Sequence, residues 1–296
     1  MGGTVTRDSL ARIPIPLPSG GGGKEERGRV LVVAGSRELI GAAILAGTAV
    51  LRVGAGKLQY NVPASIALHL GTAMPESRAV ALAETPSGAI AAEAADVIAG
   101  NAAKCSAVLI GPGLLDESAT GELVAELLPR IENVPVVLDA AAMMGLMGHR
   151  KLLSRHAGRI VLTPHSGEMA GILEREKAEI EADPARIARE VADEYGVVVV
   201  MKGACSFIAG PSAHTWSCGH GNVGLGTSGS GDTLAGFIAG LLARGADPVA
   251  AAVWGVYLHG EAGNRLARSR GLLGYLAREI PDEVPAILAE LCAPAA

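Results

Sequence analysis

The sequence predicts a three-layer α/β/α protein in which helices cover both faces of a mostly parallel central sheet. Continuous apolar runs, typical of strands buried on both faces, alternate with helical segments of small residues. Hydrophobic residues make up 49% of the 296-residue chain, yet aromatic residues make up only 3% and glycines number 40. This composition indicates close packing of small side chains. No linker interrupts the chain, so we expect a short N-terminal segment (1–28) and one large domain (29–296).

The first elements alternate between strand and helix, as in βα units. The N-terminal segment should contain a short amphipathic piece, a proline-rich connection and a flexible glycine run. A buried strand, a glycine turn and a helix come next, and a second strand and helix follow them. The turn lacks the GxGxxG spacing of a dinucleotide site. The expected ranges are Ser9–Ile13 and Gly20–Gly23 in the segment, Arg29–Gly35 and Gly41–Val53 for the first unit, and Leu58–Pro63 for the second strand.

Further strands predict the rest of the sheet. Each ends in a turn that holds glycine or a polar residue, and a hairpin follows the last parallel strand. After a second glycine-rich loop the chain is largely helical. We expect strands within Ala107–Leu115, from Val134 to Asp139, from Arg159 to Thr163 and from Glu194 to Lys202, with His214–Cys218 as the returning arm of the hairpin.

Composition excludes several classes of function. The 25 basic and 30 acidic residues give a net charge of −5. The sequence has no basic cluster with interleaved aromatic residues, so we do not expect a nucleic-acid partner. The sequence contains no apolar run of about 18 residues, which a membrane-spanning helix would need. Its first residues also lack the pattern of a secretory signal. The four cysteines show no metal-ligand spacing. We therefore expect a cytoplasmic protein with reduced thiols.

A glycine-rich loop that enters a buried helix is the main candidate site. Gly219–Gly240 reads GHGNVGLGTSGSGDTLAGFIAG, and Asp232 falls on the first turn of the predicted helix. Unpaired amides at a helix start bind anions when no bulky side chain intervenes. An aspartate at this place can take a proton from a hydroxyl that attacks a phosphoryl group. The alternative is that Ser230 or Asp232 only caps the helix.

Other candidates lie at strand ends and should converge at one edge of the sheet. His165 is interpreted as a ligand contact or a cap, Lys202 as a phosphate-binding or solvated cation, and Asp139 as a group that orients metal-bound water or caps the next segment. Small residues at Gly41–Ala43 would admit a ligand or serve helix packing. For Glu168 we prefer an interaction with the helix dipole. His220 and His259 are predicted to be structural.

Taken together, these motifs resemble a known family. VLVVAGS with GAA, VLIGPGL, VVLDA, LTPHSGEMA, MKGA and GNVGLGTSGSGDTLAGFIAGLLARG occur in this order between Arg29 and Leu291. They resemble the signatures of the ADP- or ATP-dependent NAD(P)H-hydrate dehydratases, a nucleotide-repair branch of the ribokinase-like superfamily. The resemblance implies a lyase that uses ADP or ATP, with Mg²⁺, to phosphorylate hydrated NADH or NADPH and so restore the coenzyme.

The resemblance also implies roles for individual residues. Asp232 would be the catalytic base and would contact the substrate. Mg²⁺ would be coordinated by phosphate oxygens and water molecules, with few protein ligands. A homo-oligomer, such as a tetramer, is a further implication. A separate epimerase would be the functional partner, because 296 residues leave no room for a fused epimerase. The resemblance assigns the anion hole to Ser228, Gly229, Ser230 and Gly231, the adenine nucleotide to Lys202, Gly203, Ala204, Cys205, Ser206 and Gly231, and the hydrated coenzyme to Ala42, Gly113 and His165.

The chain departs from the family pattern in places that concern the substrate side and the loop. Ala141 stands where the family has a second aspartate after Asp139, and Glu38–Ile40 replaces a common tyrosine-threonine pair. Val223 replaces a proline, Ser228 a glycine and Ser166 a proline. Two alternatives therefore stay open: a kinase of the same superfamily that phosphorylates a sugar or vitamin alcohol, and a nucleotide-binding regulator without turnover.

Overall fold

One sheet forms the centre of the molecule. The computed structural model describes residues 3–18, 23–144, 150–156 and 158–292, and its nine described strands follow the order β3-β2-β1-β4-β5-β6-β7-β8-β9. Strands β1 to β7 pair in parallel, whereas β8 and β9 are antiparallel to their neighbours. The strands are β1 (Arg29–Val33), β2 (Lys57–Pro63), β3 (Ser77–Leu82), β4 (Ala107–Ile110), β5 (Val136–Leu138), β6 (Ile160–Leu162), β7 (Val198–Met201), β8 (Ser206–Ala209) and β9 (Trp216–Cys218).

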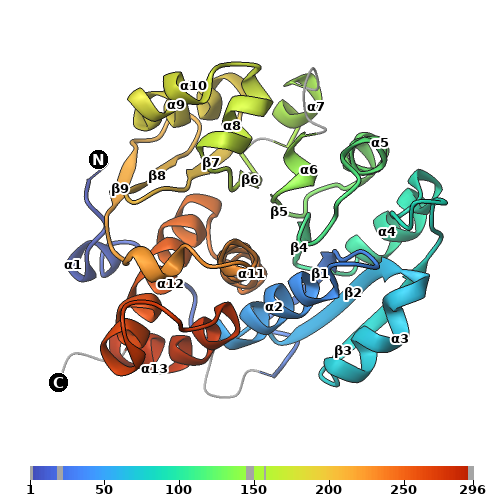
Figure 1. Ribbon diagram of the computed structural model, residues 1–296, viewed down its shortest axis with the longest axis horizontal. Helices are drawn as coiled ribbons and strands as arrows, with labels where there is room; N and C mark the ends of the chain where they lie inside the picture. Colours follow the sequence, from blue (N-terminus) through green and yellow to red (C-terminus); the bar gives the residue numbers. More distant parts are fainter. Residues whose placement is uncertain (1–2, 19–22, 145–149, 157, 293–296) are drawn as a thin grey trace.

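Helices cover both faces of the sheet, which confirms the predicted three-layer fold (Figure 1). Alternate residues of each parallel strand enter different cores: Val30 and Val32 face one, Leu31 and Val33 the other. The first core is covered by α2 (Ile40–Arg52), α3 (Ala64–Ala73), α11 (Ser230–Ala243), α12 (Pro248–Arg270) and α13 (Ile280–Cys292). The second is covered by α4 (Ala95–Ala102), α5 (Glu117–Leu127), α6 (Ala141–Met144), α7 (Arg150–Ser154), α8 (Ser166–Leu173), α9 (Lys177–Ala182) and α10 (Pro184–Tyr195).

Glycines let α11 approach α2 closely, and this contact fixes where α11 begins. A Cβ atom at Gly236 would lie 2.3 Å from the carbonyl oxygen of Ala46, so no larger residue fits there. Figure 1 shows α11 beside α2, with α12 and α13 next to it. The scarcity of aromatic residues in the sequence corresponds to this close backbone packing.

The N-terminal segment packs against the same core. Helix α1 (Arg7–Leu10) begins earlier than the predicted Ser9–Ile13, because Thr6 and Ser9 form a capping box at its start. Leu10 is buried, and the indole Nε1 of Trp254 donates to the carbonyl oxygen of Ile13 at 2.6 Å. The predicted flexible run at 20–23 lies outside the described residues except for Gly23.

Several boundaries differ from the prediction. Strand β3 was not predicted, since its alternation of exposed and buried residues is weak. The strand expected within Ala107–Leu115 ends at Ile110, where Gly111 has a φ of 133° that few other residues adopt. Short 3₁₀ turns complete the described structure: η1 (Ala92–Ala94), η2 (Leu128–Arg130), η3 (Val223–Leu225) and η4 (Ala277–Glu279). None of the described helices has the length and hydropathy needed to cross a membrane.

Candidate functional site

A large cavity lies where the carboxyl ends of β6 and β7 meet the start of α11. Its volume is about 660 Å³, and most of the predicted nucleotide-binding residues line it. The convergence expected from strand ends is therefore observed for this group. The predicted site residues that line the cavity are His165, Lys202, Gly203, Ala204, Ser206, Ser230 and Gly231; Cys205 is exposed and does not line it.

The start of α11 is built by glycine. Gly229 is the N-cap, with a φ of 88° and no side-chain cap, and Ser230 begins the helix. The hydroxyl of Ser230 is 2.9 Å from Nε2 of His259, so neither Ser230 nor Asp232 caps the helix as the alternative reading proposed. The amide of Ser230 donates to the carbonyl oxygen of Thr227 at 3.2 Å. Because the Ser230 amide already has this partner, we expect the other amides of the predicted anion hole to donate hydrogen bonds to a bound anion.

Asp232 lies on the first turn of α11 and is partly buried. Burial, and next the charge of Asp139, raise its pKa to about 7, while the charge of Lys202 opposes this change. A carboxyl group with this pKa is deprotonated in a large fraction of molecules at neutral pH and is a stronger base than an ordinary aspartate. This is the property that a general base requires.

Lys202 is a buried cation held by two carboxylates. Its Nζ lies 3.4 Å from Oδ1 of Asp139 and 3.5 Å from Oε2 of Glu168, and its side chain is only 19% exposed. Burial by itself would lower the pKa of Lys202, but the two carboxylates outweigh burial and raise it. A Cβ atom at Gly231 would lie 3.6 Å from this Nζ. The structure thus places a charged ammonium group beside the start of α11, and the solvated lysine is excluded.

Asp139 is buried between the ends of two neighbouring strands. It is 3% exposed, and its Oδ1 accepts a hydrogen bond of 2.6 Å from the hydroxyl of Thr163. It follows β5, and Thr163 follows the neighbouring β6, so the two strand ends are joined by their side chains. The role of Asp139 and Glu168 as partners of Lys202 was missed. Their only signal in the sequence is that Asp139 and Lys202 directly follow strands of one sheet, and that Glu168 lies on the first turn of the helix after β6.

His165 caps α8 and also faces the cavity. Its Nδ1 accepts from the amides of Gly167 at 3.0 Å and Glu168 at 3.1 Å. Because Nδ1 is an acceptor, the neutral ring carries its proton on Nε2, and the side chain is 58% exposed. The cap and the ligand contact are therefore compatible: Nε2 lies 3.7 Å from Oε2 of Glu168, beyond hydrogen-bond distance, so its N–H group can donate to a ligand. His165 lines the cavity with the nucleotide-binding set.

Two histidines that the sequence analysis treated as structural also line the cavity. Nε2 of His259 forms a hydrogen bond with the hydroxyl of Ser230. Burial lowers the pKa of His259 to about 4, so its ring is neutral. His220 stacks on Tyr257 with ring centroids 4.7 Å apart and pairs with Glu261 at 2.7 Å. These contacts attach the glycine loop to α12. No motif signalled them, because the partners lie on a helix far along the chain.

Ala42 and Gly113 lie together, apart from the lining of the large cavity. A Cβ atom at Gly113 would lie 2.9 Å from the Cβ of Ala42 and 2.6 Å from the carbonyl oxygen of Leu39. A second cavity of about 70 Å³ adjoins them and is lined by Gly35 and Glu38, among other residues. Glu38, one of the departures from the family pattern, is therefore part of this second cavity.

Comparison with known proteins agrees with the geometry. A family model described as NAD(P)H-hydrate dehydratase matches residues 30–286. The chain is 47% identical over 288 residues to the ADP-dependent (S)-NAD(P)H-hydrate dehydratase of Xanthomonas campestris pv. campestris, covering 97% of this chain and 96% of that protein. It is 41% identical over 280 residues to the bifunctional NAD(P)H-hydrate repair enzyme Nnr of Moorella thermoacetica, covering 95% of this chain and 53% of that protein. This chain thus spans about half the length of the bifunctional relative.

Solved structures show the same fold. The ADP/ATP-dependent NAD(P)H-hydrate dehydratase from Bacillus subtilis, co-crystallized with ATP/Mg²⁺, superposes with a TM-score of 0.80 at 28% identity, covering 98% of this chain and 99% of that chain. A hydroxyethylthiazole kinase from Pyrococcus horikoshii superposes with a TM-score of 0.59 at 18% identity, covering 97% of this chain and 95% of that chain. The second likeness concerns the fold alone.

Proposed function

We propose a function from the family to which the chain belongs, the NAD(P)H-hydrate dehydratases. In this proposal the protein dehydrates hydrated NADH or NADPH back to the intact coenzyme and consumes a nucleotide as phosphate donor. ADP is the proposed phosphate donor, because relatives that are 47% and 31% identical are named ADP-dependent. The large cavity would hold the nucleotide. The hydrated ring would approach Asp232 from the side of Ala42 and Gly113.

The chemistry proceeds in two steps. Asp232 takes the proton of the ring hydroxyl while the hydroxyl oxygen attacks the terminal phosphoryl group of ADP, so an O–P bond forms and AMP leaves. The carbon–oxygen bond of the phosphorylated intermediate then breaks and phosphate leaves with the electron pair, while the adjacent ring carbon loses a proton to solvent. A ring C=C bond forms, which restores the dihydronicotinamide. The amides at the start of α11 and the ammonium group of Lys202 would stabilise the charge on the transferred group.

One observation carries this proposal: the carboxyl of Asp232, with a pKa raised to about 7, stands on the first turn of α11, and Lys202 lies against the same turn. A base, a cation and a helix start are the three groups that phosphoryl transfer to a hydroxyl needs. Lys202 directly follows β7 and Asp232 lies on α11, so the two residues are separate in the sequence and come together only in the fold.

The residues fit a magnesium ion that arrives with the nucleotide. The described residues contain no group of three or more His, Cys, Asp or Glu side chains arranged to hold a metal. Mg²⁺ keeps several water ligands and binds phosphate oxygens, so it needs no such group. When bound, it would neutralise phosphate charge and help to orient the phosphates beside Lys202.

The test is recovery of absorbance at the reduced-nicotinamide band. Purified protein, Mg²⁺ and chemically hydrated NADH or NADPH are mixed with ADP, with ATP or with neither. We expect recovery that depends on the nucleotide, and the faster donor identifies the preferred one. A stable phosphorylated alcohol with no recovery would instead establish a kinase, and nucleotide binding without any product would establish a regulator.

We also propose that the protein is a homo-oligomer. Four large apolar side chains next to the glycine loop are exposed: Val223, Leu272, Leu273 and Leu276. They are adjacent, since a Cβ atom at Gly224 would lie 2.3 Å from the carbonyl oxygen of Leu272. Exposed apolar groups of this kind often mark an interface. Light scattering after size exclusion measures the mass, and a monomer at all concentrations would refute the proposal.

A further inference from the structure

A third cavity, lined mostly by polar residues, lies at the edge of the sheet opposite to the proposed catalytic site. Its volume is about 280 Å³, and it is lined by residues before β5 and β6, including Asn133 and Arg159. Asp139 and Thr163 of the catalytic region directly follow the same two strands. Each strand has three residues and so spans about 10 Å. The cavity is therefore separate from the nucleotide site, and no residue predicted for catalysis lines it.

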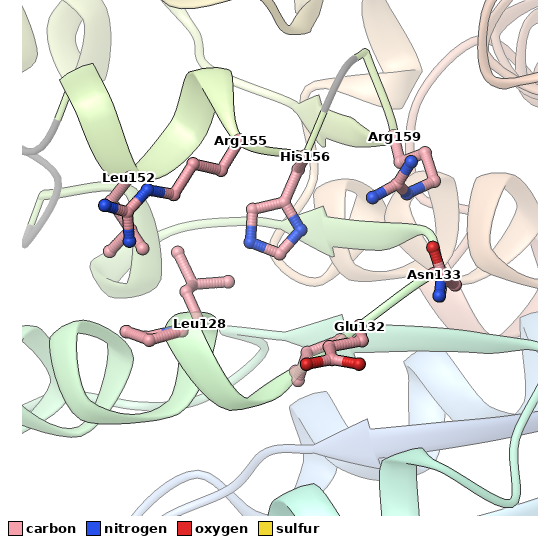
Figure 2. Close-up of a pocket in the computed structure, with 9 residues that line it drawn as sticks. Leu128, Glu132, Asn133, Leu152, Arg155, His156 and Arg159 are labelled. Atoms are coloured by element: carbon pink, nitrogen blue, oxygen red, sulfur yellow. The ribbon is translucent and has the colours of Figure 1, made fainter.

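Three basic side chains line this cavity. Figure 2 shows the ring of His156 in the middle, with Arg155 on one side and Arg159 on the other, and Glu132 across from the ring. Glu132 provides the carboxylate among the lining residues, so arginine charge exceeds carboxylate charge even when His156 is neutral. Arginine binds phosphate through planar, paired N–H groups. The arrangement favours an anion with several oxygen acceptors.

Two buried polar atoms of residues that line the cavity lack hydrogen-bond partners among the described residues. His156 is 4% exposed, and its Nδ1 has no hydrogen-bond partner among the described residues. Nε of Arg159 is also buried and also has none there. Buried polar atoms are ordinarily satisfied, and each one left over costs free energy. Two such atoms, both from residues that line one cavity, are polar groups that a bound anion could satisfy.

We propose that this cavity binds a phosphate group carried by a small hydroxylated metabolite. The guanidinium groups of Arg155 and Arg159 and a protonated His156 would hold the phosphate oxygens. Glu132 and Asn133 on the opposite wall would accept hydrogen bonds from hydroxyl groups. The volume exceeds what one inorganic phosphate fills, and this favours a phosphate ester over the bare anion.

Anion binding at this cavity would be linked to the protonation of His156. Burial, and next the charge of Arg159, lower the pKa of His156 in the free protein, while a backbone bond to Leu128 opposes this change. An anion placed against Nδ1 favours the protonated ring and raises the pKa, so affinity should increase as the pH falls. The charged groups that face the ring are Arg155, Arg159 and Glu132.

The experiment follows the histidine signals of the full-length protein by NMR, with the His156 signal assigned through His156→Gln. Glycerol 3-phosphate, inorganic phosphate and sulfate are titrated separately. We expect a saturable shift of the His156 signal with glycerol 3-phosphate, at lower concentrations than with inorganic phosphate. Sulfate keeps its charge between pH 6 and 8, so tighter sulfate binding at pH 6 reports the histidine. Signals of His165 and His220 report any binding at the nucleotide cavity.

Variants separate the cavity from general charge effects. Arg159→Gln should weaken binding at least tenfold, and Glu132→Gln should strengthen it. Lys151→Gln removes the same charge from the exposed surface of the adjacent helix α7 and should change nothing. An unshifted His156 signal in all three titrations, or equal affinity in Arg159→Gln and Lys151→Gln, would overturn the proposal. Tighter binding of inorganic phosphate than of the ester would overturn its assignment to a metabolite.

Discussion

At the scale of single residues, the site depends on a balance of three charges. Asp139 raises the pKa of Asp232, and Lys202 lowers it. Lys202 is itself held by Asp139 and Glu168. The proposed base is therefore adjusted by groups to which we assign no chemical step. The second aspartate of the family pattern is absent here, and the remaining one, Asp139, is the residue paired with Lys202.

The first prediction concerns Asp232→Asn. This variant should lose at least about a hundredfold in turnover, the range of general base catalysis, and still bind the nucleotide. It should also be more stable than the parent at pH 8. Because the folded-state pKa is raised to about 7, the fold favours the protonated carboxyl, so stability is present at low pH and falls as the pH rises toward 7.

Melting temperatures at pH 5 and pH 8 check the stability part of this prediction. The gain in Asp232→Asn should be larger at pH 8, because the parent carboxyl is mostly neutral at pH 5. Asp8→Asn removes an exposed aspartate and serves as the control. Unchanged turnover would exclude Asp232 as the base, and an equal gain at both pH values would contradict the raised pKa.

The second prediction tests the charge balance through two variants of opposite sign. Asp139→Asn removes a charge that raises the pKa of Asp232, so the acidic limb of the pH profile of kcat/KM should move to lower pH. Lys202→Met removes a charge that lowers this pKa, so the limb should move to higher pH. Shifts in the same direction would show that the two residues act through folding and not through charge.

At the scale of elements, the site depends on the way α11 begins. Gly229 precedes the helix with a φ of 88°, and a Cβ atom there would lie 2.4 Å from Cδ1 of Leu45 on α2 and 3.2 Å from the Cβ of Ala277. The conformation and the space both require glycine. The loop and the proposed anion-binding turn are thus placed by the packing of α11 on α2.

The third prediction follows from this packing. Gly229→Ala combines a backbone strain of about 1–2 kcal/mol with a clash, so the start of α11 should shift and kcat/KM should fall at least about tenfold. Gly219→Ala, in the same loop, meets no atom within 4 Å and should retain activity. Steady-state kinetics and a melting curve measure both. Equal kinetics for the two variants would mean that the geometry of this turn is not critical.

The elements themselves could mostly be predicted from the sequence. Apolar runs such as Arg29–Val33, bounded by glycine, identify strands buried on both faces, and the family motifs order them. Strand β3 was missed because an edge strand need not show a continuous apolar run. The partners of Lys202 were missed for another reason: Asp139 is 63 residues away, and only the parallel pairing of the strands brings the two side chains together.

At the scale of the whole molecule, the proposed nucleotide cavity joins elements between residues 165 and 259. Its lining comes from the turn before α8, the hairpin at β7 and β8, the glycine loop, α11 and α12. A ligand that contacts all of these elements binds only the folded chain. Ligand binding should therefore stabilise the domain as a unit, since binding to the native state alone lowers its free energy.

The last prediction measures this linkage. With Mg²⁺ present, ADP at a hundred times its dissociation constant should add about 2.7 kcal/mol to the free energy of unfolding, and should raise the melting temperature by roughly 5 °C. Asp232→Asn should retain this shift, because the carboxyl acts on the hydroxyl substrate and does not hold the nucleotide. Lys202→Met should lose most of it, because the phosphates lose their cation. If instead Asp232→Asn lost the shift and Lys202→Met kept it, the roles of base and phosphate holder would have to be exchanged.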